Sequence, residues 1–294
     1  MLWLLAMVFA VLCWAGAFIA GKIGVRSASP LALTYFRFLV GLALLYGYAR
    51  IRGIDLRIRR RDWAAMLPLG LVGMVGYHLL FFLALEHTTA IRTSMIAATN
   101  PLMTAVLAAL FLGERLNRVK VLCICAALLG VLLTISQWDL PRLLRGGVAS
   151  GDLIMLAAVL CWAGYGVLVR AQVGRFDPVV TTFHAFLVCV LALTPFQALE
   201  VARGACHITA QGWLAIVYMG AFPTFGGYLI QQQAIKHLGL TRTALFVNLV
   251  PVFTMILAVT LLHEPFFALN VVSAAIIIAS VMGYFLLGAK ARSR

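Results

Sequence analysis

One stretch of this sequence occurs twice, 150 residues apart, and this duplication restricts the possible folds more than any other feature. In the first copy, Pro101, Thr104 and Glu114 lie along one apolar segment. Their counterparts in the second copy are Pro251, Thr254 and Glu264. Internal similarity at a fixed spacing indicates an architecture built from related units. The chain is therefore expected to fold as two copies of one unit.

The duplication extends over most of the chain. The segment Val-Leu-Cys-Trp-Ala-Gly at 11–16 returns at 159–164, so Trp14 corresponds to Trp162. From Trp63 onward the spacing is 150 residues, and Trp63 corresponds to Trp213. We take residues 1–137 as the first unit and residues 150–294 as the second.

Long apolar runs set the class of protein. The sequence is 64% hydrophobic and 11% charged, whereas a soluble domain is about half apolar and a quarter charged. Ten runs each approach the ~20 residues that cross a bilayer as a helix. They cover residues 2–21, 31–49, 63–85, 90–112, 119–136, 152–171, 179–198, 213–235, 240–262 and 268–288. This pattern predicts an all-α polytopic membrane protein with ten transmembrane helices.

The basic residues in the loops predict the orientation. Sixteen lysines and arginines lie on the side that holds both termini, and six lie on the other side. The side richer in Lys and Arg faces the cytoplasm, so both termini are expected there. The net charge of +14 belongs to these short loops, and nucleic acid is not expected as a partner. Because each unit has five spans, an odd number, the two units enter the membrane from opposite sides as inverted repeats.

Three motifs carry a family resemblance. They are Trp14-Ala15-Gly16, Tyr35-Phe36-Arg37-Phe38, and the stretch from Asn100-Pro101-Leu102 to Gly113-Glu114-Arg115-Leu116, which is echoed in the second half. With these motifs the chain resembles the EamA family of the drug/metabolite transporter superfamily over essentially its whole length. One departure is His263-Glu264-Pro265, where the family usually has Gly-Glu. The resemblance implies a ten-helix exporter of small metabolites, such as amino acids, in a bacterial inner membrane.

The prolines point to a site near the middle of the membrane. Pro101 leaves the carbonyl of Ala97 without a helical partner, and Pro251 does the same for Val247. Irregular backbone at this depth is tolerated where it is buried in protein or lines a cavity. The alternative is that these prolines only kink helices for packing. The candidate substrate-binding residues are Trp14, Arg37, Tyr77, His78, Phe81, Asn100, Trp162, Tyr165, His184, Tyr228 and Asn248.

Several of these residues have a second interpretation. A histidine in a span, such as His78, faces either a water-filled cavity or a neighbouring helix to which it hydrogen-bonds. The aromatic residues either pack helices together or wall a pocket. Arg37 either snorkels to the headgroups or serves a substrate carboxylate or an outer gate. His184 is expected at the cytoplasmic side of its span, as a gate or pocket residue.

The acidic residues argue against some mechanisms. All nine fall in loops or at span ends, and no carboxylate at mid-bilayer is available to hold a cation or proton. Glu114 and Glu264 are expected to be structural, either pairing with arginines or capping a neighbouring helix. Without a coupling carboxylate, the protein is expected to be a facilitator, with His78 and His184 as the only titrating alternatives within the spans. The sequence contains neither a phosphate-binding loop nor a metal-ligand motif, so no cofactor, metal or catalytic residue is expected.

These observations predict a secondary transporter that exports small metabolites, amino acids or related compounds above all, by alternating access. The alternatives are a carrier or flippase for sugar conjugates or lipid-linked cargo, and, in another class, a membrane-embedded enzyme that modifies lipid. The expected partners are the small-molecule substrate and the bilayer. The expected oligomeric state is a monomer or a weak homodimer.

Overall fold

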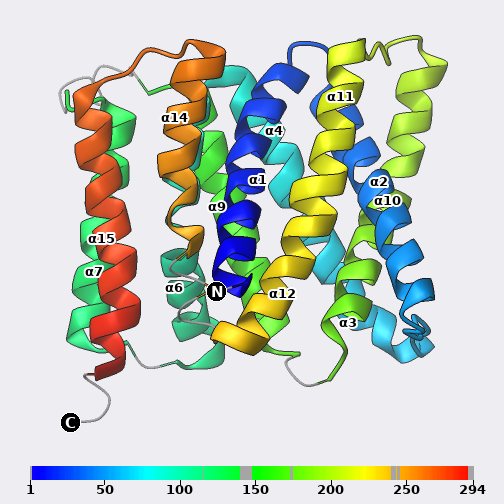
Figure 1. Ribbon diagram of the computed structural model, residues 1–294, viewed down its shortest axis with the longest axis horizontal. Coiled ribbons are helices and arrows are strands. Elements are labelled where there is room, and N and C mark those ends of the chain that lie inside the picture. The colour runs from blue at the N-terminus through cyan, green and yellow to red at the C-terminus, as the bar shows by residue number, and fades with distance from the viewer. Residues whose placement is uncertain are drawn as a thin grey trace.

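The computed structural model describes residues 2–114, 116–139, 148–172, 175–239, 243 and 246–290. Within these ranges the regular structure is helical throughout. Nine helical segments among them are long and apolar enough to cross a membrane, and Val250–Leu262 is a shorter apolar helix. Figure 1 shows the helices standing side by side in one bundle. The predicted all-α fold with ten membrane helices is confirmed.

Each half of the chain contributes five spans. The helices of the first half are α1 (Leu2–Gly24), α2 (Pro30–Ile51), η1 (Arg60–Asp62), α3 (Trp63–Pro68), η2 (Leu69–Gly76), α4 (Tyr77–His87), α5 (Ala90–Ala97), α6 (Asn100–Leu112) and α7 (Arg118–Ser136). Those of the second half are α9 (Ser150–Arg170), α10 (Pro178–Ala202), α11 (Ala210–Met219), η3 (Gly220–Gly226), α12 (Gly227–Leu238), α14 (Val250–Leu262) and α15 (Ala268–Lys290). Outside the described residues lie 240–242 and 244–245 of the ninth expected span, and the loop arginines Arg115, Arg142, Arg145, Arg242, Arg292 and Arg294.

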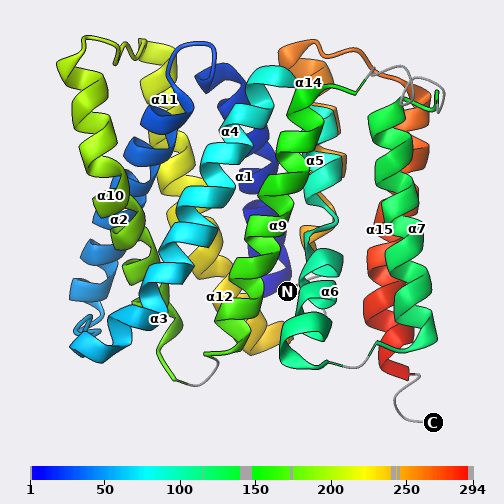
Figure 2. The same ribbon diagram turned by 180° about the vertical axis from the view of Figure 1, so that it is seen from behind.

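The fifth spans of the two halves pair at one end of the molecule. Figures 1 and 2 both show α7 and α15 side by side there, with α2 and α10 at the opposite end. The indole N–H of Trp138 donates to Ser273 Oγ at 2.9 Å and joins the ends of this pair. The helices α1, α4, α9, α12 and α14 lie between the two ends (Figure 2).

The third span of each half contains a stretch of π-helix. The two stretches, η2 and η3, are related by the 150-residue repeat. Pro223 lies inside η3 and cannot donate a backbone hydrogen bond there. A π-turn is rare and frequently marks a functional position, because its wider winding frees backbone groups and re-aims side chains.

The fourth span of each half is interrupted at its asparagine and proline. In the first half, α5 ends at Ala97, two turn residues follow, and α6 begins at Asn100 with Pro101 in its first turn. In the second half, Asn248 and Leu249 form the turn, and Pro251 lies in the first turn of α14. Proline is tolerated there because the first N–H groups of a helix have no intrahelical partner. The irregular backbone expected at both prolines is therefore present.

Glu264, in the second half of the chain, caps α5, the first helix of the interrupted fourth span. Its two carboxylate oxygens accept from the backbone N–H groups of Ala90 (2.8 Å) and Ile91 (3.1 Å), at the start of α5. Glu114, its counterpart, forms an ion pair with Arg170 at 3.0 Å. Both interactions are of the structural kind that was expected of these two residues.

These partners predict different effects for the two glutamates. Glu264→Ala should lower the free energy of unfolding by about 1.5–3 kcal/mol, because hydrogen bonds to a charged group are lost from a helix end. The matched control Glu114→Ala should change it by about 0–1 kcal/mol, since that pair is exposed. Thermal unfolding of both variants in detergent is the measurement. Equal effects would contradict the assigned cap.

Candidate functional site

A cavity of about 180 Å³ lies where the two halves meet. Helices α1, α2, α4, α5, α6, α9, α12 and α14 all contribute side chains to it. Eight of the candidate residues line it, namely Trp14, Arg37, Tyr77, His78, Phe81, Asn100, Trp162 and Tyr228. Ala97 and Ala98 at the first interruption, and Val250 and Pro251 at the second, also lie at its surface. Both interrupted spans therefore border the cavity, in addition to bending their helices.

Aromatic rings wall one side of the cavity. The Trp162 ring lies 4.8 Å from that of Tyr77 and 6.4 Å from that of Tyr228, between centroids. The Tyr77 ring in turn lies 5.9 Å from Phe81. The Trp162 indole N–H makes no hydrogen bond with the side chains and backbone that the structure describes. The wall therefore offers apolar surface together with an N–H donor for a ligand.

Trp14, the counterpart of Trp162, has a different environment. Its indole N–H donates to the carbonyl oxygen of Pro223 at 3.1 Å, within the π-helical stretch η3. The ring lies against Gly227, where an added Cβ would approach Trp14 Nε1 to 2.7 Å. Only glycine leaves room for the ring there. The repeat thus places two tryptophans at the cavity. The indole N–H of Trp14 is hydrogen-bonded to the backbone of η3.

His78 both faces the cavity and makes a hydrogen bond within the protein, which were the two alternatives for it. It lines the cavity, and its side chain is only 3% exposed. Its Nδ1 lies 3.1 Å from the carbonyl oxygen of Met74, and its ring meets the Phe38 ring edge-on at 4.7 Å. A ring nitrogen next to a backbone carbonyl carries the proton, which leaves Nε2 of a neutral ring as an acceptor. His78 can therefore accept a hydrogen bond from a neighbouring group.

Arg37 is buried and does not snorkel. Its side chain is 5% exposed, and its Nε donates to Thr224 Oγ1 at 2.7 Å, across to the second half. The guanidinium carbon also lies 5.8 Å from the centre of the Phe38 ring. Within the described ranges, no carboxylate forms an ion pair with Arg37. The cavity therefore has a cation on its wall that no described carboxylate neutralises.

Three candidate residues lie outside this cavity. Tyr165 packs against the Trp162 ring at 5.0 Å and over Gly73. His184 contacts the Trp63 ring at 5.5 Å, and its Nδ1 lies 2.8 Å from the Val180 carbonyl oxygen. Asn248 is 3% exposed within the turn of the second interruption, and its Nδ2 has no hydrogen-bond partner among the described atoms. Their part in substrate binding stays a prediction.

The cavity also contains polar residues that were not among the candidates. Ser94 and Gln231 line it, and Thr224 orients Arg37. Gln231 follows Phe81 by 150 residues, so the repeat relation alone could have identified it. The sequence contains no comparable signal for Ser94 or Thr224, because small hydroxyl residues are common in membrane helices. The first half contributes the apolar Phe81 where the second contributes an amide.

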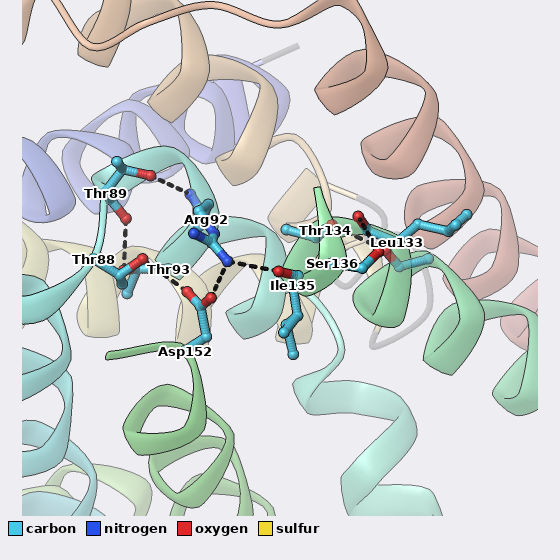
Figure 3. A network of polar contacts seen from close by, with 10 residues as sticks. Thr88, Thr89, Arg92, Thr93, Leu133, Thr134, Ile135, Ser136 and Asp152 are labelled. Carbon is cyan, nitrogen blue, oxygen red and sulfur yellow. Dashed lines mark hydrogen bonds and ion pairs between the residues drawn. The ribbon is translucent and has the colours of Figure 1, made fainter. Parts of the chain in front are cut away.

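A buried polar network joins helices at the end of the bundle where α4 connects to α5, which we call the α4–α5 end (Figure 3). Arg92 of α5 forms an ion pair with Asp152 of α9 and donates to the carbonyl oxygen of Ile135 in α7 at 2.9 Å. Thr88 Oγ1 donates to the other Asp152 oxygen at 2.7 Å. The Lys22 ammonium donates to the Thr88 carbonyl at 2.7 Å. Asp152 is fully buried, and the network links both halves of the chain.

The opposite end of the bundle has weaker links. Arg170 pairs with Glu114 at 3.0 Å, and both side chains are more than a third exposed. Arg175 pairs with Asp62 at 2.7 Å, with half of the arginine side chain exposed. Exposed pairs contribute about 0–1 kcal/mol each. The two ends of the bundle therefore differ in how their ion pairs are buried. Among the ion pairs that the structure describes, only the Arg92–Asp152 pair at the α4–α5 end has both side chains buried.

Ten membrane helices in two halves, interrupted spans and a central cavity define an integral membrane protein of the transporter class. Comparison with known proteins identifies the family. The model of the EamA-like transporter family matches residues 1–136 and 149–286, and the chain belongs to this family. The resemblance noted in the sequence is confirmed, and the chain is accordingly a transporter of the drug/metabolite superfamily with two helical repeats.

Curated relatives cover nearly the whole chain. An uncharacterized transporter of Bacillus subtilis (strain 168), YyaM, is 33% identical over 86% of this chain and 84% of the relative. A probable terminal-alkyne amino-acid exporter of Streptantibioticus cattleyicolor is 26% identical over 94% of this chain and 91% of the relative. A protein crystal structure with a TM-score of 0.67 and 22% identity covers 98% of this chain and 97% of that one. This last likeness shows the fold alone.

Proposed function

We propose that this transporter exports small carboxylate-bearing metabolites, amino acids or related compounds, across the bacterial inner membrane by alternating access. The observation that carries the proposal is Arg37, a buried cation at the central cavity without a carboxylate partner among the described residues. An unpaired buried charge is costly, and a substrate carboxylate supplies the missing counter-ion. The relative named as a probable amino-acid exporter supports the same substrate class.

The other groups around the cavity fit the rest of such a substrate. The free Trp162 N–H adds a second donor for a carboxylate, while Tyr77 and Phe81 offer apolar surface to a side chain. The buried Asn100 Oδ1 has no partner among the described atoms and suits an N–H donor such as an ammonium group. A volume of about 180 Å³ lies below the roughly 300–1,000 Å³ of pockets that hold drug-sized ligands. This supports a small metabolite over lipid-linked cargo.

The polar links suggest which end is closed. The buried Arg92–Asp152 pair holds the α4–α5 end, and the pairs at the opposite end are partly exposed. The α4–α5 end carries the loops with few basic residues, which we assign to the outside. In this state the transporter is closed toward the outside. The exposed pair Arg170–Glu114 and the partly exposed pair Arg175–Asp62 break and re-form at the cytoplasmic side during transport.

The assigned orientation predicts the result of a reporter experiment. A reporter fused after Arg294 should read cytoplasmic, and one inserted between Gln137 and Ser150 should read periplasmic, because Lys and Arg concentrate on the side of both termini. An alkaline phosphatase and a fluorescent protein fusion at each position provide the measurement. The reverse pattern would exchange the inside and outside ends.

Counterflow in proteoliposomes tests the transport itself. Vesicles loaded with unlabelled amino acid should accumulate the labelled compound, and this should persist when the pH gradient and membrane potential are collapsed, because no mid-bilayer carboxylate is available for coupling. The double variant His78→Gln, His184→Gln should retain counterflow. Uphill accumulation that follows an imposed pH gradient in this double variant would overturn the facilitator mode, and Glu86 or Asp152 would be examined next.

A further inference from the structure

The connection between α2 and α3 concentrates positive charge at one edge of the bundle. Six arginines lie between residues 50 and 61, and all six side chains are exposed. The segment alternates, since Ile54, Leu56 and Ile58 are half-buried while the residues between them are exposed. The repeat-related loop between α10 and α11 has one arginine, Arg203. The arginine cluster is therefore present in the connection between α2 and α3 and is not repeated in its counterpart between α10 and α11.

Carboxylates do not neutralise these arginines. Among the described residues, none of the six forms an ion pair. Asp55 lies within the segment, but its Oδ1 accepts from the backbone N–H of Arg57 at 3.0 Å. Asp62 pairs with Arg175 instead. The guanidinium groups of the segment are therefore available to an external anion.

A cavity of about 520 Å³ opens beside this segment. Arg50 and Arg57 line it together with Asp55, and Tyr46 and Phe183 form its apolar side. The rings of Tyr46 and Phe183 lie 6.3 Å apart, and Tyr46 is 51% exposed. Tyr46 lies five residues before the end of α2 at Ile51, roughly 8 Å deeper along the helix at 1.5 Å per residue. The apolar side therefore lies at acyl-chain depth, and the arginines lie at headgroup depth.

We propose that this cavity is a binding site for an anionic phospholipid. The phosphate lies between the guanidinium groups of Arg50 and Arg57, and the first part of an acyl chain packs on Tyr46 and Phe183. Arginine suits this ligand because its planar donors match phosphate oxygens, and basic pockets at the membrane surface select anionic headgroups. Leu56 lines the same cavity and adds apolar contact. The bound lipid fastens the exposed connection to the ends of α2 and α10.

Lipid titration of the purified full-length protein in detergent tests this site. The probes are short-chain phosphatidylglycerol, short-chain phosphatidylcholine and inorganic phosphate. Phosphatidylglycerol should bind the wild type about 25-fold more tightly than phosphatidylcholine, the equivalent of about 2 kcal/mol for two arginines. In the variant Arg50→Gln, Arg57→Gln this preference should fall to about twofold or less. Both side chains are exposed, so the variant should keep the wild-type melting temperature.

The matched control removes the same charge from the same segment. Arg59 and Arg61 are exposed and do not line the cavity, so Arg59→Gln, Arg61→Gln should keep the preference. Three results would each overturn the site: no preference in the wild type, an equal loss in the control, or inorganic phosphate competing as well as the lipid. Since the titration requires no transport, its outcome is independent of the proposed substrate.

Discussion

Arg37→Gln is expected to lower substrate affinity and export of carboxylate-bearing substrates by about 100-fold, because truncating one partner of a buried charge pair costs about 2–5 kcal/mol. Glutamine keeps much of the length and some hydrogen bonding but removes the cation. The Nε contact with Thr224 is lost as well, so the position of the side chain is no longer fixed from the second half. Initial rates of counterflow over a range of substrate concentrations measure the effect.

Two further variants separate the charge of Arg37 from its place in the fold. Arg37→Lys keeps the cation and should retain part of the affinity, although it cannot reproduce the planar fork. His78→Gln alters the same cavity without removing a permanent charge and should change affinity only modestly. If Arg37→Gln transports as well as the wild type while folding normally, Arg37 is not the carboxylate site.

Asp152→Ala is expected to reduce the free energy of unfolding by about 3–5 kcal/mol, because it leaves the buried Arg92 guanidinium without its carboxylate. Thr88 also loses the oxygen to which it donates. Figure 3 shows how these groups converge from α5, α7 and α9, so the loss affects contacts between both halves. Thermal unfolding and the half-life of activity in detergent measure it.

Matched variants show whether burial causes this effect. Glu114→Ala breaks the exposed pair with Arg170 and should cost about 0–1 kcal/mol. Replacing both partners, as in Arg92→Met, Asp152→Leu, should recover much of the lost stability, since apolar pairs often substitute for buried ion pairs. A single Asp152→Ala variant as stable as Glu114→Ala would mean that the network does not hold the bundle together.

The fold could be predicted from the sequence because its main determinants are local. Apolar runs of membrane length and prolines without an N–H act within single spans, and both predict structure from one segment alone. The repeat then related the segments, and it pointed to the structural roles of Glu114 and Glu264. The π-helical stretches were not predicted. Pro223 marks one of them by its missing N–H, but a proline alone indicates an interrupted helix and does not specify a π-turn.

The candidate site was only partly predictable because depth along a span does not specify which face of the helix a residue occupies. Tyr165 and Asn248 were placed at the same depth as cavity residues, but they are not among the residues that line the cavity. Conversely, the contact between Arg37 and Thr224 joins residues 187 positions apart, and no local pattern encodes it. Gln231 could have been found, because the repeat relates it to Phe81.

Calorimetric binding of an amino acid and of its decarboxylated amine tests the central claim most directly. The claim is that the cavity binds a carboxylate through Arg37. The account predicts that the purified protein binds an amino acid at least about 30-fold more tightly than the matching amine, and that Arg37→Gln removes this difference. Equal binding of amine and amino acid by the wild type, or a preference that survives in Arg37→Gln, would contradict it.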